Sequence, residues 1–208
     1  MAVTAPQAGG TMARLKVGDA MDLVSRVKNI LLDPQNEWRV IDAEQDQPID
    51  ILKNYVMIVA AIPAVCSFIG ASIIGAAGFR TGIFVGLTAA IIHYILTLVG
   101  VYVIAFIIDA LAPTFGGRKD FNSAFKVSAY SPTASWVAGV FALLPILSVL
   151  TILGLYSLYL LYVGLPMLMR SPPDRAIGYI IAVIVCAIIV WMLIMFIPAF
   201  LLGMRMMM

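Results

Sequence analysis

The sequence predicts an all-α integral membrane protein, a bundle of five transmembrane helices with an N-terminal cytoplasmic amphipathic helix. Three observations predict this class. The 208 residues are 62% hydrophobic and 12% charged, with a mean hydropathy of +1.03, whereas soluble domains are roughly 45–50% apolar. From Ile51 onward the charged residues lie in short gaps between long apolar intervals. The basic residues gather in alternate gaps, as they do when those gaps face the cytoplasm.

Four intervals contain no Asp, Glu, Lys or Arg, and each is long enough to cross a bilayer, which takes about 20 apolar residues at about 1.5 Å each. They are residues 54–79, 81–108, 127–169 and 176–204. A single helix over 127–169 would be about 65 Å long, about twice the hydrocarbon thickness. We therefore expect this interval to fold back on itself, with the turn between Pro145 and Gly154.

The predicted transmembrane domain covers residues 51–204. Its five spans are expected near residues 54–78, 82–109, 133–147, 152–169 and 176–202. Pro63 interrupts the first apolar interval and is expected to kink the helix there.

The positive-inside rule tests the count of five independently. With a cytoplasmic N-terminus, Arg80 and Arg205 are the basic residues in outer segments. The cytoplasmic segments hold Arg14, Lys16, Arg26, Lys28, Arg39, Lys53, Arg118, Lys119, Lys126, Arg170 and Arg175. Four spans, with 127–169 as one element, would place Arg170 and Arg175 outside and lose this asymmetry. In a bacterium the membrane would be the inner (cell) membrane.

The polar N-terminal region divides into two parts. Residues 1–18 have few aromatic or branched side chains and are predicted to form a disordered tail. Residues 19–50 form a predicted cytoplasmic amphipathic segment, with apolar residues at spacings of three and four and a helix that ends before Pro34. Trp38 suits the membrane interface. This segment either contacts the membrane surface or a partner, or it packs under the bundle.

Two ionisable side chains fall inside the predicted spans, where such groups are candidates for function. His93, the only histidine, lies near the middle of the second span and could line a path or simply hydrogen-bond a neighbouring helix. Asp109 lies about 24 Å farther along the same helix, too far to pair with His93. We expect Asp109 at the cytoplasmic interface, in an ion pair with Arg118, Lys119 or Lys126 rather than in a proton relay.

A stripe of tyrosines marks the fourth predicted span. Tyr156, Tyr159 and Tyr162 recur every third residue. Their hydroxyls could line a polar pathway, although such stripes more often serve helix packing and interfacial anchoring.

The sequence contains none of the catalytic motifs that would indicate a hydrolase. HExxH and GxSxG are both missing, and one histidine cannot supply a zinc site. We predict no catalytic residue, no metal site and no cofactor. The net charge of +2 is too small to indicate nucleic acid as a partner.

Several segments together resemble the Yip1 family, in particular its bacterial branch. They are residues 30–38 (ILLDPQNEW), 126–131 (KVSAYS), 136–141 (WVAGVF), 154–166 (GLYSLYLLYVGLP) and 171–176 (SPPDRA). The resemblance covers about residues 28–200. It adds Tyr130 and Ser131 to the candidate intramembrane polar residues.

Two features depart from the family pattern. The family commonly has a proline a few residues after the tyrosine, whereas here Pro132 directly follows Ser131 and Ala134 stands at the later place. The Asp-Leu-Tyr-Gly-Pro motif of eukaryotic members is absent, so their interaction with Rab GTPases is not carried over. The resemblance implies a five-span protein with a cytoplasmic N-terminus that associates with other membrane proteins and has no established enzymatic activity.

The sequence thus favours a non-enzymatic, Yip1-like scaffold in membrane organisation or trafficking. Its expected partners are the lipid bilayer and other membrane proteins or further copies of itself. The alternative is a small oligomeric permease or channel with a path near His93.

Overall fold

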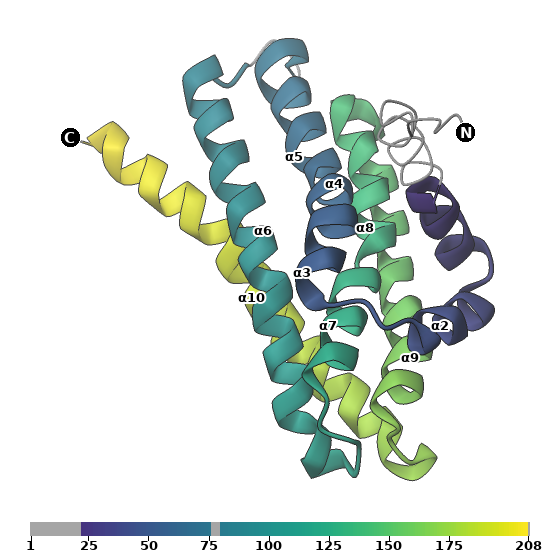
Figure 1. Ribbon diagram of the computed structural model, residues 1–208. Helices are drawn as coiled ribbons and strands as arrows, with labels where there is room; N and C mark the ends of the chain where they lie inside the picture. Colours follow the sequence, from purple (N-terminus) through teal and green to yellow (C-terminus); the bar gives the residue numbers. More distant parts are fainter. Residues whose placement is uncertain (1–21, 76–79, 208) are drawn as a thin grey trace, which may run out of the picture.

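The computed structural model describes residues 22–75 and 80–207, and all regular structure within them is helical (Figure 1). The predicted disordered tail, residues 1–18, lies outside the described residues. Four helices are long and apolar enough to cross a membrane, namely Pro48–Ile74, Ile83–Phe115, Val149–Met169 and Pro173–Ile197. The predicted all-helical membrane class is confirmed, whereas the fifth span stays a prediction.

The first long helix is irregular along its length. It consists of α3 (Pro48–Ile51), η1 (Leu52–Val56), α4 (Met57–Val59), α5 (Ala61–Phe68) and η2 (Ile69–Ile74), of which η1 and η2 are wider π-helical turns. The interruption between α4 and α5 falls at Ala60. Pro63 explains this position, because it has no N–H to donate to the Val59 carbonyl and its ring crowds that carbonyl.

The stretch predicted as the third span, residues 133–147, is built from shorter pieces. These are α8 (Thr133–Ala138), the 3-10 segment η4 (Gly139–Leu143) and the start of the next 3-10 segment, and α7 (Phe121–Tyr130) precedes them. The chain turns at Ser131 and Pro132, since proline cannot continue the hydrogen-bonding pattern of α7. For this reason no uninterrupted helix of membrane length forms between residues 121 and 143.

The interval 127–169 does fold back on itself, as predicted from its length. The reversal is at Leu144, whose backbone is extended (φ −115°, ψ 112°), rather than in the middle of the stretch between Pro145 and Gly154. The 3-10 segment η5 (Pro145–Leu155) then returns along α8 and η4. Gly154 lies within η5, where it permits close packing, since a Cβ there would be 3.0 Å from the Ser135 Cα.

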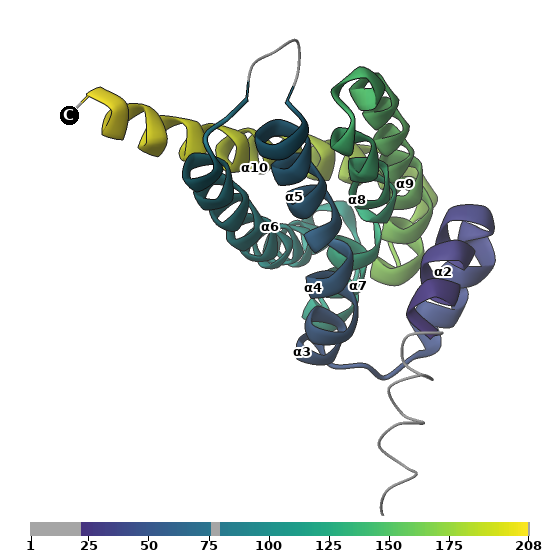
Figure 2. The same cartoon turned by 90° about the horizontal axis from the view of Figure 1, so that it is seen from above.

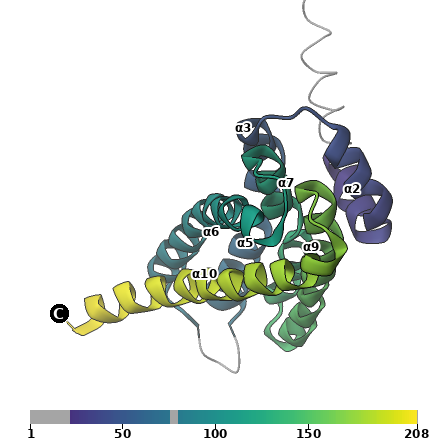
Figure 3. The same cartoon turned by 90° about the horizontal axis from the view of Figure 1, so that it is seen from below.

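The remaining long helices set the shape of the bundle. α6 (Ile83–Leu111) continues into η3 (Ala112–Phe115), and α9 (Tyr156–Met169) is joined to α10 (Pro173–Met207) by a short loop. Figure 1 shows α10 crossing behind α6 at a steep angle, and Figure 3 shows it leaving α9 at the loop and running away from it. At the crossing Gly100 allows close approach, because a Cβ there would be 2.9 Å from Ile194 Cδ1.

The N-terminal segment packs on the outside of the bundle, against α9 (Figure 2). It consists of a helix over residues 22–32, which ends ahead of Pro34, and of α2 (Pro34–Ala43). Asp33 caps α2 by accepting a hydrogen bond from the Asn36 N–H, and Pro34 fits the first helical position because its missing N–H is not needed there. Trp38 is fully buried, so its expected place at the membrane interface was wrong.

Candidate functional sites

A cavity of about 440 Å³ lies inside the bundle, between α6, the α7–α8 turn, α9 and α10. Most of its wall is apolar. Its hydroxyl and imidazole groups come from three different parts of the chain and belong to His93, Thr97, Ser128, Ser131, Ser135 and Ser157. The wall includes no Asp, Glu, Lys or Arg among the described residues. The cavity can therefore offer hydrogen bonds to an occupant but no full charge.

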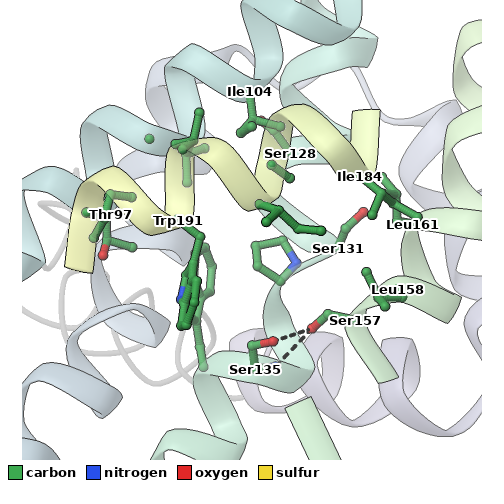
Figure 4. Close-up of a pocket in the computed structure, with 18 of the residues that line it drawn as sticks. Thr97, Ile104, Ser128, Ser131, Ser135, Ser157, Leu158, Leu161, Ile184 and Trp191 are labelled. Atoms are coloured by element: carbon green, nitrogen blue, oxygen red, sulfur yellow. Dashed lines mark hydrogen bonds between the residues drawn. The ribbon is translucent and has the colours of Figure 1, made fainter. Parts of the chain in front are cut away.

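One group of polar atoms in the wall is already satisfied. Ser135 donates from its hydroxyl to the Gly154 carbonyl (2.8 Å), and its backbone N–H donates to Ser157 Oγ (2.9 Å). The two hydroxyl oxygens are also 2.9 Å apart, so Ser157 can donate to Ser135. Figure 4 shows the pair side by side across the cavity wall. This network fastens α8 to the start of α9.

Two further serine and threonine hydroxyls are used within their own helices. Ser128 donates to the Phe125 carbonyl (2.9 Å), and Thr97 donates to the His93 carbonyl (2.9 Å). Both bonds turn a polar side chain back onto the backbone, which is a common way to satisfy it in an apolar setting.

Ser131 and His93 differ from these groups. Ser131 is 6% exposed, and its buried hydroxyl has no hydrogen-bond partner in the described part of the chain. Figure 4 shows it beside Leu161 and Ile184 in the cavity wall. The His93 ring also lines the cavity, and within the described part of the chain no hydrogen bond to its ring is found. The structure thus places two of the candidate residues in one cavity wall, and no sequence pattern connects them.

Asp109 does not form the interfacial ion pair that the sequence predicted for it. It is buried (7% exposed), and its Oδ1 has no hydrogen-bond partner. The expected cationic partners are engaged elsewhere: Arg118 pairs with Asp120 (2.6 Å), and Lys126 donates to backbone carbonyls. Among the described residues Asp109 forms no ion pair within 4 Å. Its ion pair, a prediction from proximity in sequence, is therefore not formed.

The tyrosine stripe lies on the outside of α9. Tyr156, Tyr159 and Tyr162 are 37%, 41% and 56% exposed, and none of them lines the cavity. The rings of Tyr156 and Tyr159 contact each other with centroids 5.3 Å apart. The structure separates this stripe from His93, with which it would have to cooperate in a transport path.

Tyr130 points to a second region, a group of residues that fastens the N-terminal segment to the bundle. We call this group the anchoring cluster. Its members are Arg26, Glu37, Trp38, Glu44, Lys126, Tyr130 and Gly164. Tyr130 is 4% exposed and lies edge-on to Trp38, with ring centroids 6.4 Å apart. The neighbouring residue Ser131, the first of the turn that follows α7, lines the cavity, so adjacent positions of the chain contribute to both regions.

Arg26 holds the two acidic residues of the cluster. Its guanidinium donates to Glu37 Oε1 (2.7 Å) and to Glu44 Oε1, and it lies 5.8 Å from the centre of the Tyr130 ring. Burial alone lowers the pKa of Arg26, but the hydrogen bond and charge of Glu44, with Glu37, raise it above its ordinary value. The cation is therefore stabilised where it lies, and it links the helix 22–32 to α2.

Lys126 reaches the same segment from α7. It is 4% exposed, and its Nζ donates to the carbonyls of Ile41 (2.8 Å) and Glu44 (2.6 Å) at the end of α2. Carbonyls at a helix C-terminus lack partners within the helix and carry partial negative charge. The ammonium group of a buried lysine donates hydrogen bonds to these carbonyls and also balances their partial negative charge.

Trp38 provides the apolar part of the anchor. Its indole packs onto Gly164 of α9, where a Cβ would lie 2.4 Å from Trp38 Cε2. No side chain other than hydrogen fits this gap without a shift. Outside the buried cluster, Arg170 adds an exposed ion pair with Asp42 (2.7 Å). The anchoring cluster is not fully satisfied, because Trp38 Nε1 and Glu44 Oε2 have no hydrogen-bond partner.

Sequence reasoning listed most residues of the anchoring cluster without connecting them. Lys126, Tyr130, Glu37 and Trp38 all belong to the segments that carry the family resemblance, and Gly164 lies in a third such segment. Their common place in these segments was the sequence signal that could have linked these residues to one another. The cavity serines 128, 135 and 157 carried no comparable signal, because single serines in apolar helices are common. No group of His, Cys, Asp and Glu suited to a metal ion is found in residues 22–75 and 80–207.

Comparison with known proteins gives two results. The family model described as "Yip1 domain" matches residues 28–194. The chain is also similar to the protein described as "Inner membrane protein YohC" from Escherichia coli strain K12, with 28% identity over 127 residues. The same protein from E. coli O6:H1 matches equally. The match covers 59% of this chain and 65% of the relative, so the chain spans just under two thirds of that protein. No solved structure matches.

Proposed function

Since the chain belongs to the Yip1 domain family, we propose that it is a non-enzymatic membrane scaffold that binds other membrane proteins through its anchored N-terminal segment. The proposal includes five spans, a cytoplasmic N-terminus and, by analogy with the relative described as an inner membrane protein, the inner membrane. A role in membrane organisation or trafficking follows from such binding.

The observation that carries the proposal is the anchoring cluster. A polar segment that only had to remain soluble would not need a buried lysine on its helix end or a tryptophan inserted against a glycine. Buried charges are costly, and their best-attested use is to specify one arrangement. Here that arrangement is the position of the helix 22–32 and of α2 on α9. We infer that the segment is held in place so that its outer face can be recognised.

The outer face has the composition of a binding surface beside a membrane. Its exposed polar residues include Lys28, Asn29, Gln35, Asn36 and Arg39, together with the acidic Asp22 and Asp33. Exposed apolar side chains lie among them, namely Val24 (65%), Leu32 (73%) and Val40 (49%). Mixed basic and apolar surfaces suit both an acidic, partly apolar protein partner and anionic lipid head groups.

The arrangement of the helices supports the five-span topology. In Figure 1 the end of α6, the start of α7, the end of α9 and the start of α10 lie at one end of the bundle, and the reversal between α8 and α9 lies at the other. Arg118, Lys119, Arg170 and Arg175 belong to the first end, whereas the reversal at Leu144 has no charged neighbour in sequence. If α7, α8 and η4 together cross the membrane, the basic residues face the cytoplasm.

Site-specific photo-crosslinking in living cells tests partner binding. A photoreactive residue replaces Arg39 on the outer face, and a matched one replaces Phe84, which is 87% exposed at the start of α6. We expect discrete cross-linked protein species from position 39 and none of the same species from position 84. Adding Lys126→Met, which releases the end of α2, should reduce the cross-links from position 39 at least fivefold. Equal patterns from both positions, or no effect of Lys126→Met, would refute the proposal.

Cysteine accessibility tests the topology separately. We expect Val149→Cys, which lies just after the chain reversal and is 71% exposed in the native protein, to react with a membrane-impermeant maleimide from outside. Arg118→Cys should react only from the cytoplasmic side. Both variants use a background in which Cys66 and Cys186 are replaced by alanine. Labelling of position 149 from the cytoplasm would exclude the five-span arrangement.

The permease or channel alternative predicts a path lined by His93 and by the tyrosine stripe. Only His93 lies where that alternative needs it. His93 lines a cavity, but the tyrosine stripe lies on the outer surface of α9. Flux of small solutes into proteoliposomes that is abolished by His93→Leu would restore this alternative.

A further inference from the structure

We propose that the cavity at His93 and Ser131 binds an uncharged, largely apolar lipid whose hydroxyl or carbonyl oxygen hydrogen-bonds these two side chains. The inference concerns a ligand site inside the membrane and does not depend on partner binding by the N-terminal segment.

The cavity has the size and lining of a ligand site. Its volume of about 440 Å³ falls within the range of roughly 300–1,000 Å³ that is typical of small-molecule pockets. Such pockets are lined mainly by apolar side chains with a few polar groups that orient the ligand. Apolar residues from α6, α9 and α10 form most of this wall, and the polar groups come from α6, from α7 to α8 and from the start of α9.

The charge of the wall restricts the ligand. No acidic or basic side chain lines the cavity in the described residues, and a charge moved into such surroundings without a partner is strongly destabilised. An anionic phospholipid head group or an ammonium ion is therefore a poor occupant. A hydroxyl or a carbonyl carries hydrogen-bonding capacity without charge.

The hydrogen-bonding pattern shows where the polar atom of the ligand lies. The hydroxyls of Thr97, Ser128, Ser135 and Ser157 are all engaged within the protein. Ser131 is the exception, because its hydroxyl is buried without a partner. Buried polar groups are nearly always paired, and one that is not calls for an explanation. A ligand oxygen that accepts from or donates to Ser131 supplies the missing bond, and a neutral imidazole at His93 offers one further donor and one acceptor.

The wall also shows how an apolar tail reaches the site. Ile188, Trp191 and Met195 of α10 and Leu158 of α9 line the cavity and are 48%, 60%, 41% and 45% exposed. Residues that belong to both the wall and the outer surface of a spanning helix border an opening toward the acyl chains. These rim residues come from α9 and α10, so the opening lies between these two helices. The tail can remain in the bilayer while the oxygen enters.

Photoaffinity labelling in nanodiscs tests the proposal. The probe is a sixteen-carbon alcohol with a diazirine in its chain, and labelled peptides are identified by mass spectrometry. We expect saturable labelling of peptides from α9 and α10 that line the cavity. Unlabelled hexadecanol should compete, whereas hexadecane and palmitate should compete at least about fivefold less well. Equal competition by hexadecane would show that the polar group is not recognised and would overturn the proposal.

Two matched serine variants separate hydrogen bonding from packing. Ser131→Ala removes the unpartnered hydroxyl, and Ser128→Ala removes a hydroxyl of the same wall that is already bonded to Phe125. A net hydrogen bond of about 1 kcal/mol corresponds to about a fivefold change in affinity. We therefore expect half-saturation to rise about fivefold in Ser131→Ala, about tenfold or more when His93→Leu is added, and less than twofold in Ser128→Ala.

Three outcomes would contradict the proposal. The first is the same half-saturation in Ser131→Ala and Ser128→Ala. The second is labelling that does not saturate and spreads equally over the exposed start of α6, which indicates bulk lipid only. The third is a cavity closed by another copy of the chain, seen as cross-linking between copies from position 191 together with no labelling by the alcohol. The folded state of each variant is checked by its thermal unfolding temperature.

Discussion

The anchoring cluster and the cavity are both buried, partly polar regions, and they share helix α7, yet they treat their polar atoms differently. In the anchoring cluster Arg26 makes two hydrogen bonds within the N-terminal segment, and Lys126 of α7 makes two hydrogen bonds to that segment. In the cavity the Ser131 hydroxyl has no hydrogen-bond partner among the described residues, and the His93 ring lines the same volume. Paired groups of this kind fix one element against another, whereas unpaired groups beside a cavity leave hydrogen bonds for a ligand. The comparison assigns positioning to the first region and recognition to the second.

The largest loss of stability is expected when the apolar centre of the anchoring cluster is removed. Trp38→Ala deletes a fully buried indole, and such changes cost about 3–5 kcal/mol. We expect a loss of this size in the free energy of unfolding, measured by titration with SDS in mixed micelles. Trp191→Ala is the control, because Trp191 is 60% exposed at the cavity rim and its loss should cost less than about 1 kcal/mol. Equal losses would contradict the comparison.

A smaller and sharper test uses two glycines. Gly164→Ala places a Cβ 2.4 Å from Trp38 Cε2, whereas Gly82→Ala meets no atom within 4 Å. Overpacking of a buried contact costs about 1–3 kcal/mol, and the Gly82 variant should stay within about 0.5 kcal/mol of the native protein. Limited proteolysis reports where the damage lies: Gly164→Ala should expose residues 43–48 to cleavage, and Gly82→Ala should not. Protection of that stretch in both variants would show that Trp38 can shift without loss.

A third test acts on both regions through the start of α7. Asp120 caps α7 by accepting from the N–H groups of Asn122 and Ser123. Burial alone raises the pKa of Asp120, but hydrogen bonds from Arg118 and Ser123 hold it below its ordinary value. A carboxylate with a lowered pKa stabilises the fold above its unfolded-state pKa of about 3.9 and ceases to do so as the pH falls through the folded-state value.

We therefore expect stability to fall below about pH 4 in the native protein and to depend less on pH in Asp120→Asn. Asp120→Ala should cost about 1 kcal/mol at neutral pH, since it removes the cap. Thermal unfolding in a non-ionic detergent between pH 3 and 7 measures both effects. An unchanged pH dependence in Asp120→Asn would show that this carboxylate does not contribute.

The smallest change in the free energy of unfolding is expected for Ser131→Ala, in the cavity wall. Ser131→Ala removes a buried hydroxyl that has no partner, and removing such a group is neutral or stabilising. Its free energy of unfolding should lie within about 0.5 kcal/mol of the native value, in contrast to the anchor variants. A loss above about 1 kcal/mol would mean that Ser131 has a structural partner and serves packing.

The class of this protein and much of its chain path follow from the amino-acid sequence. Interval lengths and composition are additive properties, so they predicted an all-helical membrane protein, and the excess length of 127–169 required a reversal. They could not find the break at Ser131 and Pro132 or the reversal at Leu144, because the positions of such breaks depend on which neighbours pack there. The length criterion therefore gives four spans in the structure and five in the prediction.

Which polar residues lie in the same region depends on the packing of distant segments. His93 and Ser131 are far apart in sequence and line one cavity, whereas Tyr130 and Ser131 are adjacent and belong to different regions, because neighbouring side chains of a helix point in directions about 100° apart. Trp38 was expected at the membrane interface and Lys126 in a cytoplasmic segment, but the packing of α2 on the bundle buries both. Hydropathy and charge are properties of single residues, but pairing and burial are properties of contacts, and contacts between distant segments exist only in the folded chain.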